Sequence, residues 1–265
     1  MRRPYIGITG AVTRDEVRYI CDQFSETDSL NLMHQPMIGI LASKKTLNGE
    51  EVENRRYPSI ENLPGLMEEA RKNDSVLTML HYNTSRKRDD QWSLEVIRAL
   101  EGVYSDGLCD AIQLNMVWPE IDQIISIKEQ MSGLGIVLQL SKSAMNERTP
   151  EEIGEMVNRY DHTIDYVLID PSGGRGLNFN VEESVEVYLE IKRRRMDLVV
   201  GFAGGLNGEN VGEVVRSVGE RIGNGSFCID VEKGVRDEQS EKYGDDVLNN
   251  RKVSEFIQGT MSILS

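Results

Sequence analysis

Cysteine is rare in this sequence, and no apolar run is long enough to cross a membrane. The cysteines Cys21, Cys109 and Cys228 are far apart and odd in number, which excludes a zinc or redox motif built on paired cysteines. Each lies beside an apolar run, so we expect buried thiols in a reducing cytoplasm. No stretch approaches the ~20 apolar residues of a membrane span, and the N-terminus lacks the apolar core of a signal peptide. These absences predict a cytoplasmic protein with no membrane partner.

Basic residues are outnumbered, which argues against a nucleic-acid partner. The chain has 30 Lys and Arg against 44 Asp and Glu, a net charge of −14, and such a surface repels polyanions. Its longest basic run, Arg193-Arg194-Arg195, ends a predicted helix, where positive charge complements the helix dipole. The sequence also lacks a dinucleotide fingerprint and a cluster of zinc ligands, so we expect no cofactor and no metal ion.

Strand-like and helix-like segments alternate along the chain. Its 265 residues fit one (β/α)8 barrel, which typically needs about 250, as a single domain over residues 1–265. Eight short apolar runs, several of them β-branched, are typical of parallel strands buried on both faces. These runs are Tyr5–Thr9, Met37–Ala42, Val76–Tyr82, Ala111–Met116, Ile136–Leu140, Tyr166–Asp170, Leu198–Ala203 and Ser226–Val231. The predicted fold class is an α/β TIM barrel; the alternative is an open doubly wound sheet, which usually has fewer strands.

Helix signals stand between the predicted strands. Thr13, with a glutamate three residues later, and Thr149, with proline next, are predicted N-caps. Later helices are predicted over Asn207–Val218 and Val253–Ile263.

Two long connections, residues 43–59 and 83–91, follow the second and third predicted strands. In a barrel both would lie on the catalytic face. Loops of this length are often lids or binding loops, although a mobile surface insertion remains open.

Glycine-rich turns follow the last three predicted strands, over Asp170–Gly176, Ala203–Asn207 and Asp230–Val235. Glycine lets backbone N–H groups approach an oxyanion closely, and such turns form anion-binding nests. A single turn of this kind is more often only a tight turn, but in barrels a phosphate commonly sits between the loops after strands seven and eight. We therefore predict a phosphate site on the backbone of Gly204, Gly205, Gly234 and Val235.

Two carboxylates end predicted strands. Asp170 ends an otherwise apolar strand and would point into the barrel mouth as a general acid or base, or as a hydroxyl-binding group. The alternative is a helix N-cap or a loop-ordering aspartate. Asp230 ends the eighth strand, and we interpret it as a structural anchor of its loop.

Together these segments resemble phosphoribosylanthranilate isomerase, the barrel enzyme of tryptophan biosynthesis. The family has an aspartate and a Gly-Gly-x-Gly loop after strand six, Ala-Gly-Gly-Leu after strand seven and Asp-Val-x-x-Gly-Val after strand eight. The corresponding segments here are Asp170–Gly176, Ala203–Leu206 and Asp230–Val235. The family's Asp-x-x-Gln-Leu of strand four is matched by Asp110, Gln113 and Leu114, and its substrate-contacting Arg-Tyr pair by Arg56 and Tyr57.

The resemblance implies a general acid at Asp170 and substrate contacts at Arg56, Asn115, Gly174 and Gly176. It spans nearly the whole chain and is strongest in the last third. Asn115 departs from the family pattern, which has a histidine after Gln-Leu.

The first strand departs further from that family. Where the family reads Lys-Ile-Cys-Gly, with the cysteine as general base, this chain reads Gly7-Ile8-Thr9-Gly10. A threonine hydroxyl has no accessible ionised form near neutral pH, so Thr9 cannot abstract a proton as a thiolate does. Thr9 nevertheless stands at the catalytic position, and we take it with Asp170 as a candidate catalytic residue.

Among the histidines, His81 is the one placed to reach the barrel mouth as a replacement base, with a packed or solvent-facing histidine as the alternative. His34 lies in a loop before the second strand. His162 lies on the opposite face, and we assign it no chemistry.

The favoured hypothesis is therefore an isomerase-like enzyme that acts on a phosphorylated sugar or phosphoribosyl-type small molecule by acid/base proton transfer, and not the authentic isomerase. Two alternatives are the authentic isomerase of tryptophan biosynthesis and a non-catalytic protein that binds or senses a phosphometabolite. A homodimer, formed through the helices or the long loops, remains open.

Overall fold

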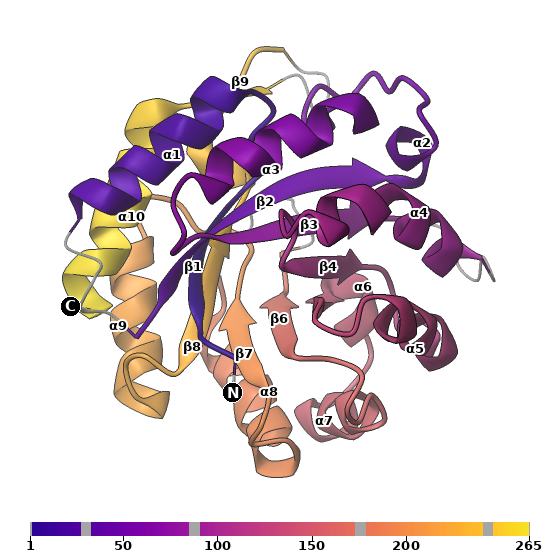
Figure 1. Ribbon diagram of the computed structural model, residues 1–265. Coiled ribbons are helices and arrows are strands. Elements are labelled where there is room, and N and C mark those ends of the chain that lie inside the picture. Colours follow the sequence, from indigo (N-terminus) through magenta and orange to yellow (C-terminus); the bar gives the residue numbers. More distant parts are fainter. Residues whose placement is uncertain (1, 28–32, 85–90, 173–178, 241–245, 265) are drawn as a thin grey trace.

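The computed structural model describes residues 2–27, 33–84, 91–172, 179–240 and 246–264. Eight parallel strands form a closed barrel ringed by helices (Figure 1), which confirms the predicted α/β TIM barrel. The strands are β1 (Tyr5–Thr9), β2 (Gln35–Ser43), β3 (Leu77–Asn83), β4 (Ala111–Asn115), β5 (Gly135–Ser141), β6 (Tyr166–Asp170), β7 (Val199–Phe202) and β8 (Phe227–Val231). The predicted bounds of β1 and β6 are the observed ones, and every other predicted strand end lies within two residues of the observed end.

Pairing between the first and last strands closes the sheet. Ile6 is in register with Ile229, and Ile8 with Val231. The alternative of an open doubly wound sheet is therefore wrong. The ring of helices closes at the same place, because Tyr19 of α1 (Arg14–Glu26) donates its hydroxyl to the Asn250 carbonyl oxygen at the start of α10 (Asn250–Leu264), at 3.1 Å (Figure 1).

Side-chain caps fix the starts of α1 and α7 (Pro150–Asn158) where the sequence predicts them. Thr13 and Thr149 each accept a hydrogen bond from the backbone N–H of a glutamate three residues later, and that glutamate's carboxylate accepts from the backbone N–H of the threonine. Each cap satisfies backbone donors that a helix start otherwise leaves unpaired.

Helix α9 (Val211–Ile222) begins four residues later than predicted, because Asn207 instead forms a turn. Its side-chain oxygen accepts hydrogen bonds from the backbone N–H groups of Glu209 and Asn210. The remaining helices are α2 (Lys44–Leu47), α3 (Leu63–Arg71), α4 (Trp92–Ser105), α5 (Ile121–Gln130), α6 (Lys142–Met145) and α8 (Val181–Arg194), with 3₁₀ helices η2 (Ile60–Asn62) and η3 (Lys233–Val235).

Two smaller predictions are also confirmed. All three cysteines are buried and form no disulfide. The basic run ends α8, with Arg195 at the C-cap. Of the helices in the described ranges, none combines the length and the hydropathy of a membrane span.

Alternate residues of each strand point into the barrel, whose two ends differ in character. At the N-terminal ends of the strands the interior is filled by an apolar layer: Tyr5, Met37, Leu77, Ala111, Val137, Tyr166, Val199 and Cys228. Nearer the C-terminal ends the buried interior side chains include polar ones: Thr9, His81, Gln113, Gln139, Asp170 and Asp230. Burying polar groups costs free energy unless they are hydrogen-bonded. Because packing of the fold alone does not require polar side chains here, we expect a ligand-binding site at this end of the barrel.

Candidate functional site

A cavity of about 540 Å³ opens at the C-terminal ends of the strands. Its size falls in the range of small-molecule sites, about 300–1,000 Å³. The strands contribute its floor: Thr9, His81, Gln113, Gln139, Leu168, Asp170 and Asp230. Loops and turns contribute its rim, chiefly Arg56, Gly204, Gly205, Glu232, Gly234, Arg236, Arg251 and Lys252. The cavity therefore brings both predicted catalytic residues and three of the four predicted phosphate-binding residues to one place.

Asp170, at the end of β6, is buried and accepts hydrogen bonds on both carboxylate oxygens. Ser172 donates to Oδ1 from its backbone N–H at 3.2 Å and its hydroxyl at 2.9 Å, and Gln139 Nε2 donates to Oδ2 at 2.8 Å. These donors suit an ionised carboxylate, which only accepts. A Cβ atom at Gly204 would collide with Asp170 Oδ1, so the carboxylate lies against the turn after β7. Asp170 thus both lines the cavity and orders the first residues of its own loop.

Two glutamines carry the polar floor from Asp170 across the barrel to β3. Gln113 Nε2 donates to Gln139 Oε1 at 3.0 Å and lies 3.4 Å from His81 Nε2. Burial lowers the pKa of His81, although the charges of Glu232 and Asp170 act in the opposite direction, so the ring is neutral near pH 7. His81 is therefore packed into the floor, with a ring nitrogen toward Gln113.

Asp230, on β8, is the second carboxylate of the floor. Its Oδ1 and Oδ2 lie 3.0 and 3.4 Å from the Thr9 hydroxyl, which donates to it across the β1–β8 pair. Burial raises the pKa of Asp230 to about 7; the Thr9 hydrogen bond lowers this pKa, and the charges of Glu232 and Asp170 raise it. The carboxyl group therefore gains or loses a proton near neutral pH.

The departure at Gly7 makes room for Asp230. Gly7 is in register with Asp230 on the neighbouring strand, and a Cβ atom at Gly7 would lie 2.9 Å from Asp230 Oδ1. With a lysine at this position, as in the family pattern, the Asp230 carboxylate and the end of the Met37 side chain would have to shift. Over the described residues, no lysine or arginine forms an ion pair with Asp230, so burial is not offset by a cation.

The turns after β7 and β8 meet at the rim. Gly204 and Gly205 have positive φ angles of 87° and 70°, which glycine adopts without strain. A Cβ atom at Gly234 would collide with the Leu206 carbonyl oxygen, so the two turns are in contact. Within the described part of the chain, the N–H groups of Gly204 and Gly205 have no acceptor. The turns therefore offer glycine N–H donors beside the cavity.

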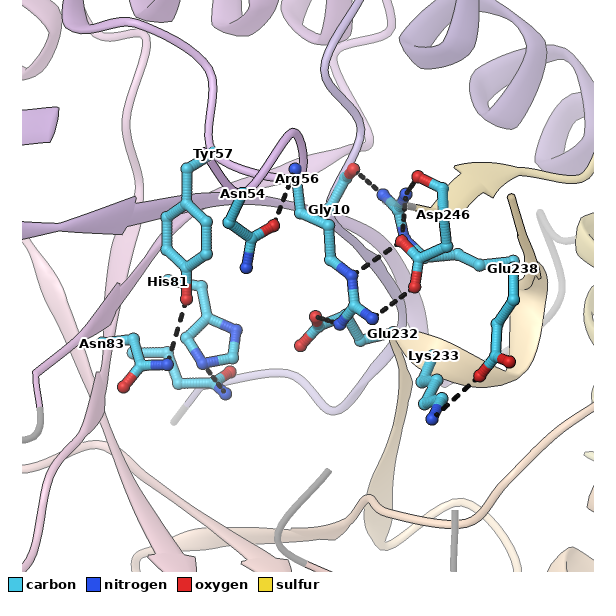
Figure 2. Close-up of polar contacts among 12 residues, drawn as sticks. Gly10, Asn54, Arg56, Tyr57, His81, Asn83, Glu232, Lys233, Glu238 and Asp246 are labelled. Atoms are coloured by element: carbon cyan, nitrogen blue, oxygen red, sulfur yellow. Dashed lines mark hydrogen bonds and ion pairs between the residues drawn. The ribbon is translucent and has the colours of Figure 1, made fainter. Parts of the chain in front are cut away.

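Arg56, in the connection after β2, points into the rim but is already engaged (Figure 2). Its Nε and Nη2 donate to Asp246, with Nε–Oδ1 at 2.7 Å, and its Nη1 donates to Glu232 at 2.9 Å. Burial lowers the pKa of Arg56, but the Asp246 hydrogen bonds and the Glu232 charge outweigh it, so the net shift is upward. The neighbouring Tyr57 hydroxyl accepts from Asn83 at the end of β3, at 3.0 Å.

Two predicted site residues lie outside the cavity lining. Asn115 is half-buried at the end of β4 and does not line the cavity. Val235 is buried in η3 and does not line the cavity either. Gly174 and Gly176 fall outside the described residues. His34 is buried, with Nε2 2.8 Å from the Phe227 carbonyl oxygen, and the exposed His162 precedes β6 on the far face.

The rim beside the glycine turns carries basic side chains. Lys233, Arg251 and Lys252 line the cavity, and each is paired at the surface with a carboxylate: Lys233 with Glu238 at 3.3 Å, Arg251 with Glu255 at 3.4 Å and Lys252 with Asp237 at 2.7 Å. No group of three or more His, Cys, Asp or Glu side chains in the described ranges is arranged to hold a metal ion.

Sequence reasoning assigned no site role to Asp230, which lines the cavity, or to Asp246, which pairs with the rim residue Arg56. Asp230 was interpreted as a loop anchor, yet its side chain faces the cavity; the signal was available, because Asp230 alternates with the inward-facing Cys228. Asp246 lies on an unpredicted two-stranded hairpin formed by β9 (Arg236–Glu238) and β10 (Asp246–Leu248). Strands of three residues with charged side chains leave no periodic signal.

Comparison with known proteins agrees with this architecture. The family model described as N-(5'phosphoribosyl)anthranilate (PRA) isomerase matches residues 110–259, more than half of the chain. A solved Rubisco-like protein from Rhodopseudomonas palustris has a similar fold, with a TM-score of 0.57 and 11% sequence identity. That similarity covers 97% of this chain but only 63% of the other, and at this identity it shows the fold alone. No curated protein matches the sequence.

Proposed function

Because the chain belongs to the N-(5'phosphoribosyl)anthranilate (PRA) isomerase family, we propose that it binds a phosphorylated sugar or phosphoribosyl-type molecule and catalyses acid/base proton transfer on it. The observation that carries the proposal is the shared cavity of Asp170 and Asp230, two buried carboxylates in contrasting environments. Pairs of this kind separate an acid from a base in one site.

The hydrogen bonds favour Asp170 as the base and Asp230 as the acid. Donors from Ser172 and Gln139 suit an ionised Asp170, whereas Asp230 is fully buried, has one hydroxyl donor, and keeps its proton up to about pH 7. The family resemblance gave the acid role to Asp170, so this is a reversal of roles. Thr9 then acts as a positioning residue for Asp230.

The proposed chemistry is redox-neutral and needs no further reactant. The base takes the hydrogen on the carbon next to a carbonyl; the C–H electron pair forms a C=C bond, and the carbonyl oxygen takes the proton of the acid. The protonated base then gives its proton to the former carbonyl carbon, while the hydroxyl on the neighbouring carbon returns its proton to the carboxylate of the acid and becomes the new carbonyl, which completes an isomerisation. For a ring-closed sugar, ring opening comes first: the acid protonates the ring oxygen as the anomeric hydroxyl loses its proton, and this proton restores the acid.

The phosphate of the substrate would lie at the turns after β7 and β8. The glycine N–H groups of Gly204 and Gly205 supply neutral donors, and Lys233, Arg251 and Lys252 supply positive charge to the same rim. Placing the phosphate there would bring the rest of a sugar chain over Asp170, which lies against Gly204.

A second candidate is the authentic isomerase of the family, which the match over residues 110–259 favours. Against it, the first strand carries Thr9 where the resemblance expects the base cysteine, and Arg56 is occupied by carboxylates of the protein. Phosphoribosylanthranilate is fluorescent, and the family reaction removes this signal. We expect little or no loss of fluorescence with this protein; rapid loss would establish the second candidate.

The test of the first candidate measures hydrogen exchange at C2 of ribose 5-phosphate in D₂O, with proton NMR monitoring the loss of the C2 hydrogen signal. We expect the wild type to accelerate the exchange, and Asp170→Asn and Asp230→Asn each to slow it by about 10²–10⁴-fold, the usual contribution of an acid or base. Asp122→Asn, on the exposed face of α5, is the matched control. Ligand binding without exchange would identify a non-catalytic binding protein and exclude the acid/base proposal.

A further inference from the structure

The guanidinium of Arg56 lines the cavity, yet two carboxylates of the protein satisfy it. Arg56 Nε and Nη2 donate to the two carboxylate oxygens of Asp246 in a bidentate ion pair, and Nη1 donates to Glu232 at 2.9 Å (Figure 2). The side chains of Arg56 and Asp246 are only 3% and 4% exposed. The donor face that would bind an external carboxylate is thus covered by groups of the chain itself.

This arrangement is built from distant segments. Arg56 comes from the connection after β2, Glu232 follows β8, and Asp246 belongs to the β9–β10 hairpin. Asp246 also faces Arg236, with Nη1–Oδ1 at 3.5 Å, and Arg236 in turn donates to the Gly10 carbonyl oxygen after β1. Two arginines and two carboxylates balance one another, so the cluster needs no counter-charge from a ligand.

Displacement of Asp246 by a ligand carboxylate would be unfavourable. The outgoing carboxylate is covalently part of a packed hairpin and is held by a second arginine, so it competes intramolecularly, and losing its partner would leave a buried charge partly unpaired. A ligand carboxylate would also meet Glu232 on the same rim, and like charges at close range discriminate strongly between ligands.

We propose that Asp246 and Glu232 are specificity-determining residues that act as an internal carboxylate pair on Arg56, so that the ligand carries a phosphate and an uncharged, hydroxyl-bearing remainder. This inference rests on the proposed function, because it describes the end of the ligand away from the phosphate. It narrows the substrate class to sugar phosphates without a carboxylate.

The test compares two ligands that differ at one carbon: ribitol 5-phosphate, which ends in CH₂OH, and 5-phosphoribonate, which ends in a carboxylate. Affinities are measured by calorimetry at fixed ionic strength. We expect the wild type to bind ribitol 5-phosphate at least about tenfold more tightly. Asp246→Asn should release Arg56 and reduce this preference at least about fivefold, through tighter binding of 5-phosphoribonate.

Glu232→Gln is the second variant, because Glu232 is 30% exposed and its loss leaves the buried Arg56–Asp246 pair intact. It should also reduce the preference. Glu238→Gln is the matched control: it removes a negative charge from the same hairpin, but its partner is Lys233 rather than Arg56, so the preference should remain. Folding of each variant is checked by its thermal melting.

Three outcomes would overturn the inference. If the wild type binds both ligands with equal affinity, Asp246 and Glu232 do not determine ligand specificity, but the proposed phosphate site is still supported. The same conclusion follows if folded Glu232→Gln and Asp246→Asn both keep the wild-type preference. If neither ligand binds, the proposed phosphate site fails, and this inference fails with it.

Discussion

The two ends of the barrel interior are equally buried but differ in what their side chains do. At the N-terminal end, Tyr5, Met37 and Tyr166 belong to an apolar layer and are each at most 1% exposed. Four residues further along the same strands, Thr9 and Asp170 are nearly as buried, yet they face a cavity and bond to other polar groups. Burial alone therefore does not separate residues that stabilise the fold from residues that face a ligand.

The difference lies in what surrounds each buried group. Close packing of apolar side chains stabilises the fold through dispersion contacts, whichever atoms they touch. Buried polar groups need specific partners, and a protein that buries a carboxyl group without a cation, as at Asp230, gives up stability. This contrast predicts opposite responses to substitution at the two ends.

The largest effect on stability is expected at the apolar end, from Met37→Ala. Met37 is fully buried and does not line the cavity, so truncation leaves a void and should lower the free energy of unfolding by about 2–5 kcal/mol. Urea unfolding measures this loss, and the affinity for ribitol 5-phosphate should be unchanged. Met37→Leu, of similar volume, should cost less than about 1.5 kcal/mol. A variant that loses affinity but keeps its stability would contradict the division between the two ends.

At the polar end, Asp230→Asn should raise the free energy of unfolding, in contrast to Met37→Ala, which lowers it. The pKa of Asp230 is about 7 in the folded state and about 3.9 when unfolded. Between these values the folded protein binds more protons, so wild-type stability falls as the pH rises through this window. The asparagine side chain of the variant cannot titrate. The free energy of unfolding of the variant, relative to that of the wild type, should therefore rise by up to about 1.4 kcal/mol per pH unit through this window.

This gain is measured by urea unfolding from pH 4 to 8. The charged or titratable groups that face Asp230 are Glu232, Asp170, Tyr5 and Cys228, and all of them are retained in the variant. Stability curves that run parallel with pH would show that Asp230 ionises as in the unfolded chain.

Much of the barrel could be predicted from the sequence, because its signals are local. Runs such as Tyr166–Asp170 define strands, and Thr13 and Thr149 define helix starts within four residues of chain. The glycine turns were found for the same reason. Arg56 shows what local signals miss: it was expected to hold a ligand, but its partner Asp246 lies 190 residues away on a hairpin with no sequence pattern.

The smallest predicted effect isolates Thr9, which lies at the polar end of β1. Its hydroxyl donates to Asp230 and lowers that pKa, so Thr9→Val should move the pH midpoint of the Asp230 titration upward, whereas Thr9→Ser should keep it. Above pH 7, where the carboxylate form dominates, the valine variant should lose about 0.5–1.5 kcal/mol. Carboxyl ¹³C chemical shifts follow the midpoint directly. An unchanged midpoint with slower exchange at C2 would instead mean that Thr9 acts on the substrate itself.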